Sequence, residues 1–306
     1  MITTEAHIRP FLRLGQQLRQ PDTVRQRFGE AIRMQYQRNP WFTPECCEQA
    51  IRGVVLLLDE NAIRTRLEKH PNLPHPTPQT IALLPAGDMP LQAFPDLLDI
   101  LLAGHRLQCH QAPDDNLLLP IIVQMLAETE PTWAERIRFT DKITDVDAFI
   151  ADVEPAQLDT FDQYFNGKPH LLRIRKGKTL ILTGKEDDNT LRQIAHDICT
   201  YFGRGPKAIR KLIVPQGYDF QPLFQQLQEA SIPLTTHNRF LNHLEYQKAI
   251  HLMSRRPYLD AGAFLFRESN SDFPPVAVVH YAYYTNEPLV QATPTEDTLT
   301  FLEHLV

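Results

Sequence analysis

Residues 80–109 read TIALLPAGDMPLQAFPDLLDILLAGHRLQC, and this stretch indicates the class of fold that the chain adopts. It begins with a short apolar run that ends in a Pro-Ala-Gly turn. A segment with apolar residues at helical spacing follows and ends at Gly104, where a second short strand-like run begins. A strand, a helix and a strand in this order are typical of a crossover unit with parallel strands. The sequence therefore predicts a parallel sheet covered by helices.

The same alternation continues toward the C-terminus. Residues 113–128 have helical spacing, residues 148–152 form a short apolar run, and residues 155–165 have helical spacing again. Apolar runs at residues 170–174 and 178–184 begin a second series of strands. This series continues through segments at residues 187–202, 211–215, 220–230, 246–253, 263–266 and 276–284, and a short helix is expected over residues 295–306. The alternation predicts an α/β protein with two domains.

The N-terminal side of this stretch has a different pattern. The first 70 residues have apolar positions at helical spacing and predict a set of helices. Thr43 followed by Pro44 is typical of an N-cap with proline in the first helical turn. The segment HPNLPHPTPQ, residues 70–79, holds four prolines and predicts an irregular linker before the first strand.

Composition and charge exclude several classes of function. The formal net charge is −6 and no basic run is present, so we expect no nucleic-acid partner. The longest apolar run, residues 54–58, is too short to span a membrane, and the first residues do not resemble a signal peptide. The four cysteines show no CxxC spacing, which favours a reducing cytoplasm as the location.

Groups that could perform chemistry are scarce. Gly203, Gly205 and Ala208 form the outline of a dinucleotide fingerprint, but a helix precedes them and Pro206 removes one amide that could face a phosphate. No serine lies in a nucleophile elbow. Cys199 lies on a helical stripe with apolar residues, which is typical of a small buried side chain rather than a reactive thiolate.

The remaining polar groups have ordinary structural interpretations. The three histidines between residues 237 and 251 match no metal-binding signature, so no metal site is expected. The aspartate pairs at residues 114–115 and 187–188 each precede a helical segment, where they would act as caps. Taken alone, the residues indicate a two-domain α/β protein without a convincing catalytic group.

Five segments resemble a known family. They are NPWFTPE (residues 39–45), residues 81–107, residues 175–220, YQKAIHLM (residues 246–253) and PYLDAGAFLFRE (residues 257–268). Their order is similar to that in the acyl-CoA reductases of the bacterial luminescence type, and most similar to the shorter Bacteroidetes-like members. That family belongs to the aldehyde dehydrogenase superfamily. The resemblance extends over roughly residues 25–290.

This resemblance implies a fold and a reaction. Residues 1–168 would form N-terminal helices and a Rossmann-like domain that binds NADPH, and residues 169–306 would form a second α/β domain that supplies a cysteine. In the family this cysteine attacks a fatty acyl thioester, and hydride from the cofactor releases an aldehyde. The reaction requires a thiolate, an oxyanion hole and a held nicotinamide.

The residues at the reacting positions depart from the family pattern. The turn after Tyr-Phe-Gly carries the nucleophilic cysteine in the family, and here that position is Pro206, which has neither a thiol nor a backbone N–H. The oxyanion asparagine of the family corresponds to Asp88, whose ionised carboxylate would repel an oxyanion. Loss of one oxyanion donor typically costs roughly 10²–10³ in rate.

The expected cofactor positions depart as well. The lysine that contacts the cofactor corresponds to His110. The small glycine-containing turn corresponds to Val153 and Glu154, where a side chain hinders close approach of the backbone and a negative charge opposes a pyrophosphate.

These departures favour a degenerate enzyme that binds no cofactor. We expect it to act as a partner in an acyl-transfer or reductase complex, or to bind an acyl thioester. The alternative is an active NADPH-dependent fatty acyl-CoA reductase that makes aldehyde through a displaced nucleophile, with Cys199 as the outside candidate. A different reaction on the same fold is the third alternative.

Overall fold

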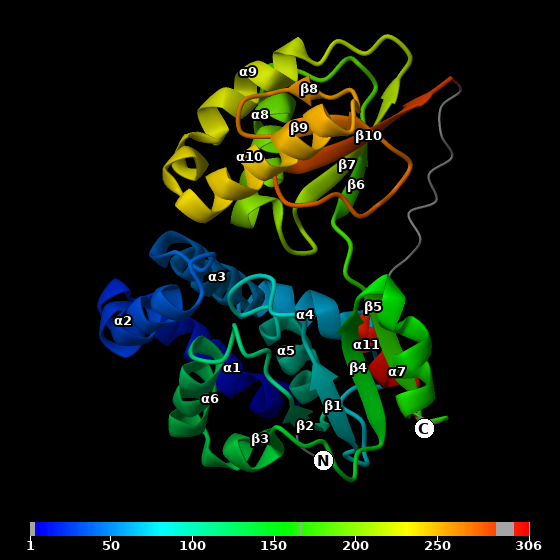
Figure 1. The fold of residues 1–306 in the computed structure, drawn as a ribbon. Coiled ribbons are helices and arrows are strands. Elements are labelled where there is room, and N and C mark those ends of the chain that lie inside the picture. The colour runs from blue at the N-terminus through cyan, green and yellow to red at the C-terminus, as the bar shows by residue number, and fades with distance from the viewer. Residues whose placement is uncertain (1–3, 166, 286–296, 306) are drawn as a thin grey trace. The chain divides into compact units, whose positions relative to one another are not determined.

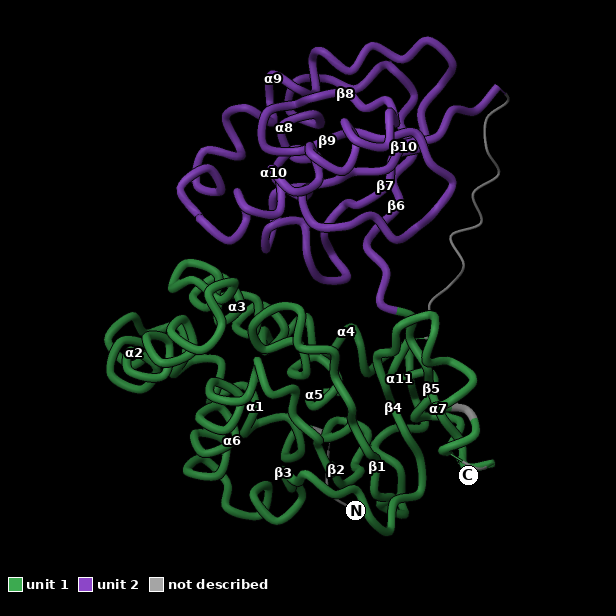
Figure 2. Tube along the Cα trace, in the orientation of Figure 1, with its two compact units in different colours: residues 1–174, 293–306 green, residues 175–292 purple. Residues whose placement is uncertain are grey.

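The structure is a computed structural model that describes residues 4–165, 167–285 and 297–305. It divides into two compact units (Figure 2). Unit 1 comprises Met1–Ile174 together with Thr293–Val306, and unit 2 comprises Arg175–Ala292.

Unit 1 begins with the helices that the sequence predicted. They are α1 (Thr4–Leu18), α2 (Pro21–Arg38), α3 (Pro44–Leu57) and α4 (Glu60–Glu68). The start of α3 follows the predicted cap, because the hydroxyl of Thr43 accepts a hydrogen bond from the backbone N–H of Cys46 at 3.2 Å and Pro44 occupies the first turn. Phe11, Phe28 and Phe42 are almost fully buried among these helices and the helices of the sheet.

The sheet of unit 1 has five strands in the order β3-β2-β1-β4-β5, and every neighbouring pair is parallel. The strands are β1 (Thr80–Leu84), β2 (Arg106–Cys109), β3 (Ile137–Phe139), β4 (Ala148–Val153) and β5 (His170–Ile174). The chain moves outward from β1 to β3, then returns and continues outward from β4 to β5. The direction therefore reverses between β1 and β4, which is where ligands bind in open α/β sheets.

Helices connect the strands of this sheet (Figure 1). They are α5 (Phe94–Leu102), α6 (Leu118–Thr129) and α7 (Leu158–Phe165), with short 3-10 turns η1 (Pro131–Arg136) and η2 (Pro155–Gln157) before β3 and α7. Helix α5 is buried along its whole length. The predicted strand–helix–strand unit at residues 80–109 is confirmed, whereas β3 was not predicted because its three residues are too short a run for their alternation to stand out.

The C-terminal helix α11 (Thr298–Glu303) also belongs to unit 1. Leu299 and Leu302 are buried, and the Glu303 carboxylate lies 2.9 Å from Nδ1 of His70. Because β5 pairs with β4 and α11 packs on α5, the segments at residues 169–174 and 297–305 lie in unit 1. The sequence-based division at residue 168 assigned both segments to the second domain.

Unit 2 contains a second five-stranded sheet, in the order β6-β7-β10-β9-β8. The strands are β6 (Lys178–Ile181), β7 (Ile209–Pro215), β8 (Leu259–Asp260), β9 (Leu265–Glu268) and β10 (Val278–Tyr284). All neighbours are parallel except β8 and β9, which form a hairpin. The helices are α8 (Asp188–Cys199), α9 (Gln221–Ala230) and α10 (Asn238–Met253), with 3-10 turns η3 (Thr200–Gly203) and η4 (Ile232–Thr236).

Helices α8 and α9 pack side by side in unit 2. Asp187 caps α8 as predicted, since its carboxylate accepts a hydrogen bond from the backbone N–H of Thr190 at 2.7 Å. Aromatic rings from α9 and the sheet form a cluster, in which the ring centroids of Phe224 on α9 and Phe266 on β9 lie 4.9 Å apart. The predicted helix over residues 187–202 ends earlier, at Cys199, because Tyr201 and Phe202 have positive φ and stop the helix.

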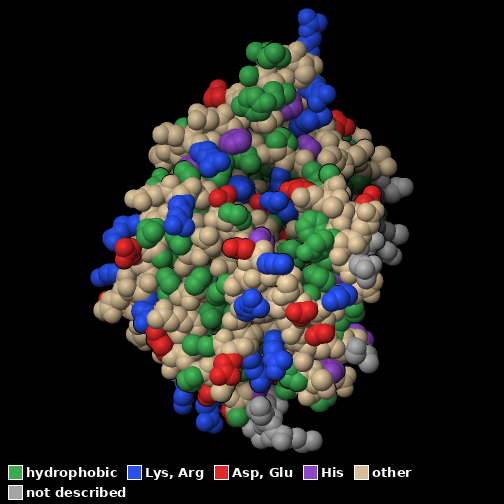
Figure 3. Space-filling view, turned by 60° about the horizontal axis from the view of Figure 1, so that its bottom comes forward, with side chains coloured by type: hydrophobic (Ala, Val, Ile, Leu, Met, Phe, Trp, Pro, Cys, Tyr) green, Lys and Arg blue, Asp and Glu red, His purple; other side chains and the backbone are tan. Residues whose placement is uncertain are grey.

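Among the described residues, no helix combines the length and hydrophobicity that a membrane crossing requires. Figure 3 shows basic and acidic side chains interspersed over the visible face, with hydrophobic side chains scattered between them. Residues 286–290, 295, 296 and 306, to which the resemblance and the predicted C-terminal helix extend, lie outside the described residues.

Candidate functional site at the carboxyl edge of the first sheet

Four of the six positions singled out in the sequence lie at one edge of the unit 1 sheet. Asp88 follows β1, His110 follows β2, and Val153 and Glu154 lie at the end of β4. The three strands are parallel neighbours, with Leu83 opposite both Cys109 and Ile150, so their carboxyl ends meet at the same edge. The topology thus brings these positions to the edge at which a Rossmann-like sheet binds its ligand.

The turn after β1 is closed by its own side chains. Gly87 has a φ of +70°, and a Cβ atom there would lie 2.3 Å from Cβ of Ala112, so only glycine fits. The backbone N–H of Asp88 donates to Oε1 of Gln92 at 2.7 Å. Asp88 itself is half-buried. The backbone of this turn is therefore held by Gln92, which lies two residues before α5 begins.

Asp115 stabilises the same turn, which corrects one sequence-based interpretation. Its two carboxylate oxygens accept hydrogen bonds from the backbone N–H groups of Leu91 and Gln92, at 3.1 and 3.2 Å. The aspartate pair at residues 114–115 was expected to cap the next helix, but α6 begins at Leu118 without a side-chain cap. Asp115 is buried against the turn after β1 instead, and burial raises its pKa to about 6.

A buried ion network occupies the position where the strand order reverses. Nε of Arg173, on β5, donates to Oδ1 of Asp152 on β4 at 3.1 Å. Its two terminal nitrogens bind both oxygens of Asp96 on α5, at 2.8 and 2.5 Å. The Asp96 and Asp152 side chains are only 5% and 10% exposed. Arg173 is thus paired with two carboxylates that are almost inaccessible to water.

Further donors complete this network. Oδ2 of Asp152 accepts from the backbone N–H of Ala86 at 3.2 Å and from Nε2 of Gln92 at 3.1 Å. The hydroxyl of Thr298, on the C-terminal helix, donates to Oδ1 of Asp96 at 2.7 Å. A buried ion group is tolerated only when its members are hydrogen-bonded in this way. The network links the turn after β1 with β4, β5, α5 and α11.

The pKa values of Asp152 and Arg173 are both raised, but for different reasons. Burial raises the pKa of Asp152, and the nearby Arg173 guanidinium only partly offsets this effect. Burial by itself would lower the pKa of Arg173, but the carboxylates of Asp96 and Asp152 outweigh it and raise that pKa. Arg173 therefore stays charged, and its charge is neutralised internally.

The turn after β4 has few free amide donors. The backbone N–H of Glu154 donates to Oε1 of Gln157 at 3.1 Å, and Gln157 donates back to the Glu154 carbonyl at 2.9 Å. Pro155 has no N–H, and the N–H of Leu158 binds the Pro155 carbonyl. Val153 is fully buried in a cluster with Phe149 and Phe165 and contributes packing.

His110 is held by its neighbours as well. Its backbone N–H donates to the Leu83 carbonyl at 3.0 Å, and its ring Nδ1 lies 3.3 Å from the Thr140 carbonyl oxygen. The ring is half-buried between the ends of β2 and β3. His110 therefore makes contacts within the protein, at the position where the family resemblance implies a lysine that contacts the cofactor.

Pro206 lies in unit 2, in the turn between η3 and β7. It is exposed and follows Gly205, whose φ is +82°. Tyr201, Phe202 and Gly203 precede it with three consecutive positive φ values, of 48°, 61° and 69°. Left-handed backbone at two adjacent aromatic residues is strained and persists only where the surrounding structure holds it.

None of the four cysteines presents an open thiol. All four are buried and unpaired, and Cys199 at the end of α8 is only 8% exposed. Burial raises the pKa of Cys47, Cys109 and Cys199 to about 12, and it raises that of Cys46 as well. Such thiols stay protonated at neutral pH and are poor nucleophiles.

The residues at the carboxyl edge do not fit the pyrophosphate of a dinucleotide. A pyrophosphate needs free amides or unpaired basic groups, as at the N-terminus of a helix. Here Asp152, Glu154 and Asp88 supply negative charge, and the arginine is already paired. In the described ranges there is also no cluster of three or more His, Cys, Asp or Glu side chains that could hold a metal ion.

The sequence reasoning missed Asp96, Asp152, Arg173 and Thr298. One signal was available, since Asp96 and Asp99 interrupt an otherwise apolar helix and are each 3% exposed. Charged residues are almost never fully buried without a partner, so they call for one. The identity of the partners was not readable, because Arg173 is 77 positions and Thr298 is 202 positions away from Asp96.

Comparisons with solved structures identify the fold. A Burkholderia cenocepacia protein assigned as an aldehyde dehydrogenase has a TM-score of 0.61 at 14% identity, over 92% of this chain and 70% of its own. An indole-3-acetaldehyde dehydrogenase complexed with NAD+ has a TM-score of 0.61 at 11% identity, over 93% and 68%. An aldehyde dehydrogenase from Mycobacterium tuberculosis complexed with NAD+ has a TM-score of 0.50 at 13% identity, over 68% and 52%.

No protein-family model and no curated protein matches the sequence. Against the three structures the chain spans 52% to 70% of the compared protein's length. Identities this low establish the architecture and leave function to be argued from the site. The α/β fold expected from the sequence is confirmed, and the chain has an aldehyde dehydrogenase-like fold with an N-terminal helical segment.

Proposed function

We propose that this protein is a catalytically degenerate form of the aldehyde dehydrogenase fold, related to the acyl-CoA reductases, that binds instead of reacting. It would act as a complex partner in fatty-acyl metabolism or hold an acyl thioester reversibly. The observation that carries the proposal is the buried network of Arg173, Asp96 and Asp152, which fills the reversal point of the sheet with internally paired charge.

Two further observations support the loss of chemistry. Covalent acyl transfer needs a thiolate, and the position expected for it holds Pro206 while all four thiols are buried. Stabilising an oxyanion needs a donor, and Asp88 would bring a carboxylate to that role. The alternative, an active NADPH-dependent reductase with a displaced nucleophile, would require Cys199 to leave a buried position at the end of α8.

Cofactor binding is the first test. We expect neither NADPH nor NADH to bind with a dissociation constant below about 1 mM, the upper end of ordinary substrate affinities. Isothermal titration calorimetry measures this directly. A low-micromolar dissociation constant for either nucleotide would overturn the proposal.

Acyl transfer is the second test. Incubation with labelled long-chain acyl-CoA and NADPH should give no covalent band on a denaturing gel and no aldehyde in a trapping assay. Pro206→Cys alone should change little, because Asp88 and Glu154 remain. The combination with Asp88→Asn, Val153→Gly and Glu154→Ser should label more than the single variant. A wild-type band that disappears on thiol alkylation would show that a nucleophile is present.

A further inference from the structure

A cavity opens at the amino edge of the unit 1 sheet, opposite the edge that carries the ion network. Its volume is about 370 Å³, within the range of small-molecule sites. The lining comes from the loop before β4, from β4 itself and from the end of α7 with the turn that follows. The lining residues are Ile143, Thr144, Asp145, Val146, Phe149, Tyr164, Phe165 and Lys168.

Aromatic rings form one wall of this cavity. Phe149 and Phe165 are stacked with ring centroids 4.1 Å apart, and the Tyr164 ring meets Phe149 edge-on at 6.4 Å. Phe165 is 1% exposed, whereas Tyr164 is 63% exposed. Phe149 is also buried, so a flat apolar ligand would meet mainly the Tyr164 ring, which the stacked pair supports from below and which is otherwise in water.

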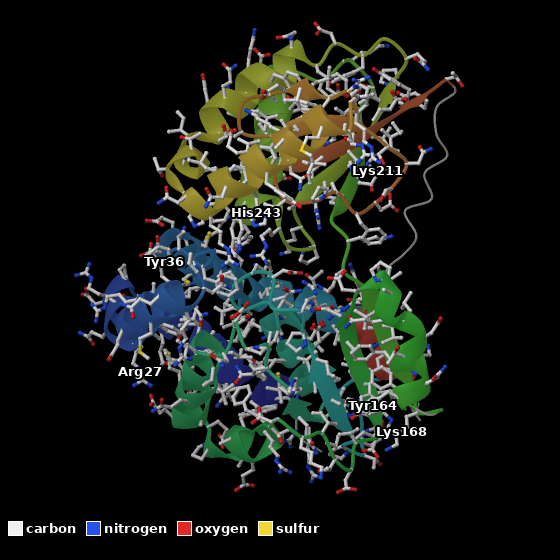
Figure 4. The ribbon with its side chains drawn as sticks, viewed as in Figure 1. Arg27, Tyr36, Tyr164, Lys168, Lys211 and His243 are labelled. Atoms are coloured by element: carbon white, nitrogen blue, oxygen red, sulfur yellow. The ribbon has the colours of Figure 1, made fainter. Side chains whose placement is uncertain are left out.

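Lys168 supplies the cation. Its ammonium donates one hydrogen bond to the Val146 carbonyl, at 2.5 Å, which positions the group over the loop. It makes no ion pair within the part of the chain that the structure describes, so two of its three N–H groups can serve a ligand. Figure 4 shows Tyr164 and Lys168 close together at the end of α7.

The loop side of the cavity is fixed in place. Gln108, on β2, accepts a hydrogen bond from the backbone N–H of Thr144 at 3.2 Å and donates to the Thr144 carbonyl at 2.7 Å. Asp145 follows with a φ of 53° and is exposed. The loop thus presents one carboxylate beside a site that otherwise offers an ammonium and aromatic rings.

We propose that this cavity binds a small aromatic monocarboxylic acid. The ring would lie against Tyr164, above the buried Phe149 and Phe165, and the carboxylate would accept a charge-assisted hydrogen bond from Lys168. The Asp145 carboxylate disfavours a second negative charge on the ligand. The site does not depend on the proposed function, because it shares no residue with the carboxyl edge.

The binding test uses 3-phenylpropionate as the probe, with titration calorimetry and ligand-observed NMR on the full chain. Lys168→Met should weaken binding by about tenfold or more, the value of one charge-assisted hydrogen bond. Tyr164→Ala should weaken it about fivefold through lost ring contact. The matched control is Lys142→Met, which removes an exposed lysine of the neighbouring loop that does not line the cavity, and binding should then stay within about twofold.

Two analogues test the ligand class. Phenethylamine carries the opposite charge and should not bind, and phenylsuccinate carries a second carboxylate and should bind more weakly than 3-phenylpropionate. Tyr164 and Lys168 are exposed, so their variants should keep the circular dichroism spectrum of the parent. Equal binding of the amine, an unchanged affinity of Lys168→Met, or no binding of 3-phenylpropionate would each overturn the proposal.

Discussion

Replacement of Arg173 by methionine should strongly destabilise unit 1. Methionine keeps most of the length and the apolar stem but removes the guanidinium, which makes three hydrogen bonds to Asp96 and Asp152. Both carboxylates would then remain buried at 5% and 10% exposure without their cation. Breaking a buried ion pair by removing one partner typically costs about 3–5 kcal/mol of unfolding free energy.

The loss should depend on pH in a defined direction. In the parent, burial already raises the pKa of Asp152, and Arg173 is the main group that lowers it again. Without Arg173 this pKa rises further, so the folded variant retains protons that the unfolded chain releases. The destabilisation is then largest at neutral pH and shrinks as the pH falls and the carboxyls become protonated.

Urea unfolding followed by circular dichroism at about pH 7.5 and about pH 5 measures both effects. Arg138→Met is the matched control, since Arg138 is exposed on β3 and its loss should cost less than about 0.5 kcal/mol. The double variant Arg173→Met with Asp96→Asn should recover part of the loss. A loss below about 1 kcal/mol, or one that is equal at both pH values, would refute the role assigned to the network.

Three other changes test separate parts of the structure. Gly87→Ala should lower the free energy of unfolding by about 2 kcal/mol or more, since φ is +70° and the new Cβ meets Ala112; a loss below about 0.5 kcal/mol in urea unfolding would contradict this. Ellman's reagent should find no rapidly reacting thiol in the native protein and four after denaturation, and a fast native reaction would show that a cysteine is accessible. Burial lowers the pKa of His105 to about 4, so falling pH favours the unfolded state, and His105→Gln should remove about 2 kcal/mol of the stability difference between about pH 8 and pH 5. Ile81→Val, a truncation of a fully buried side chain that cannot titrate, is its control and should lower stability equally at both pH values.

The fold was readable from the sequence where local pattern and turn chemistry agree. The stretch at residues 80–109 combines a short apolar run, a helical period and a closing glycine, and the structure has β1, α5 and β2 there. Thr43 with Pro44, and Asp187, predicted two helix starts correctly. These features depend on contacts within a few residues, which is the range that a sequence pattern describes.

Elements without such a pattern were misjudged. The strand β3 has only three residues, and one alternation of Ile137, Arg138 and Phe139 is too short to be distinguished from a loop. Asp115 lies just before a helix, where an aspartate is typically a cap, but its carboxylate is buried against Leu91 and Gln92. Local position suggested one role, and a contact across more than twenty residues determined another.

The candidate site shows the same division. The sequence by itself determined which groups are missing from the positions of interest, because Pro206 and Asp88 lack the required thiol and amide whatever their surroundings. It also determined that the chain alternates strands and helices as an α/β fold. Only the tertiary structure decided what stands at the reversal point of the sheet, since Asp96, Asp152, Arg173 and Thr298 come from four separate elements. The charges of Asp96, Asp152 and Arg173 are tolerated only because the fold places each one beside its partner, and these partners are distant in the sequence.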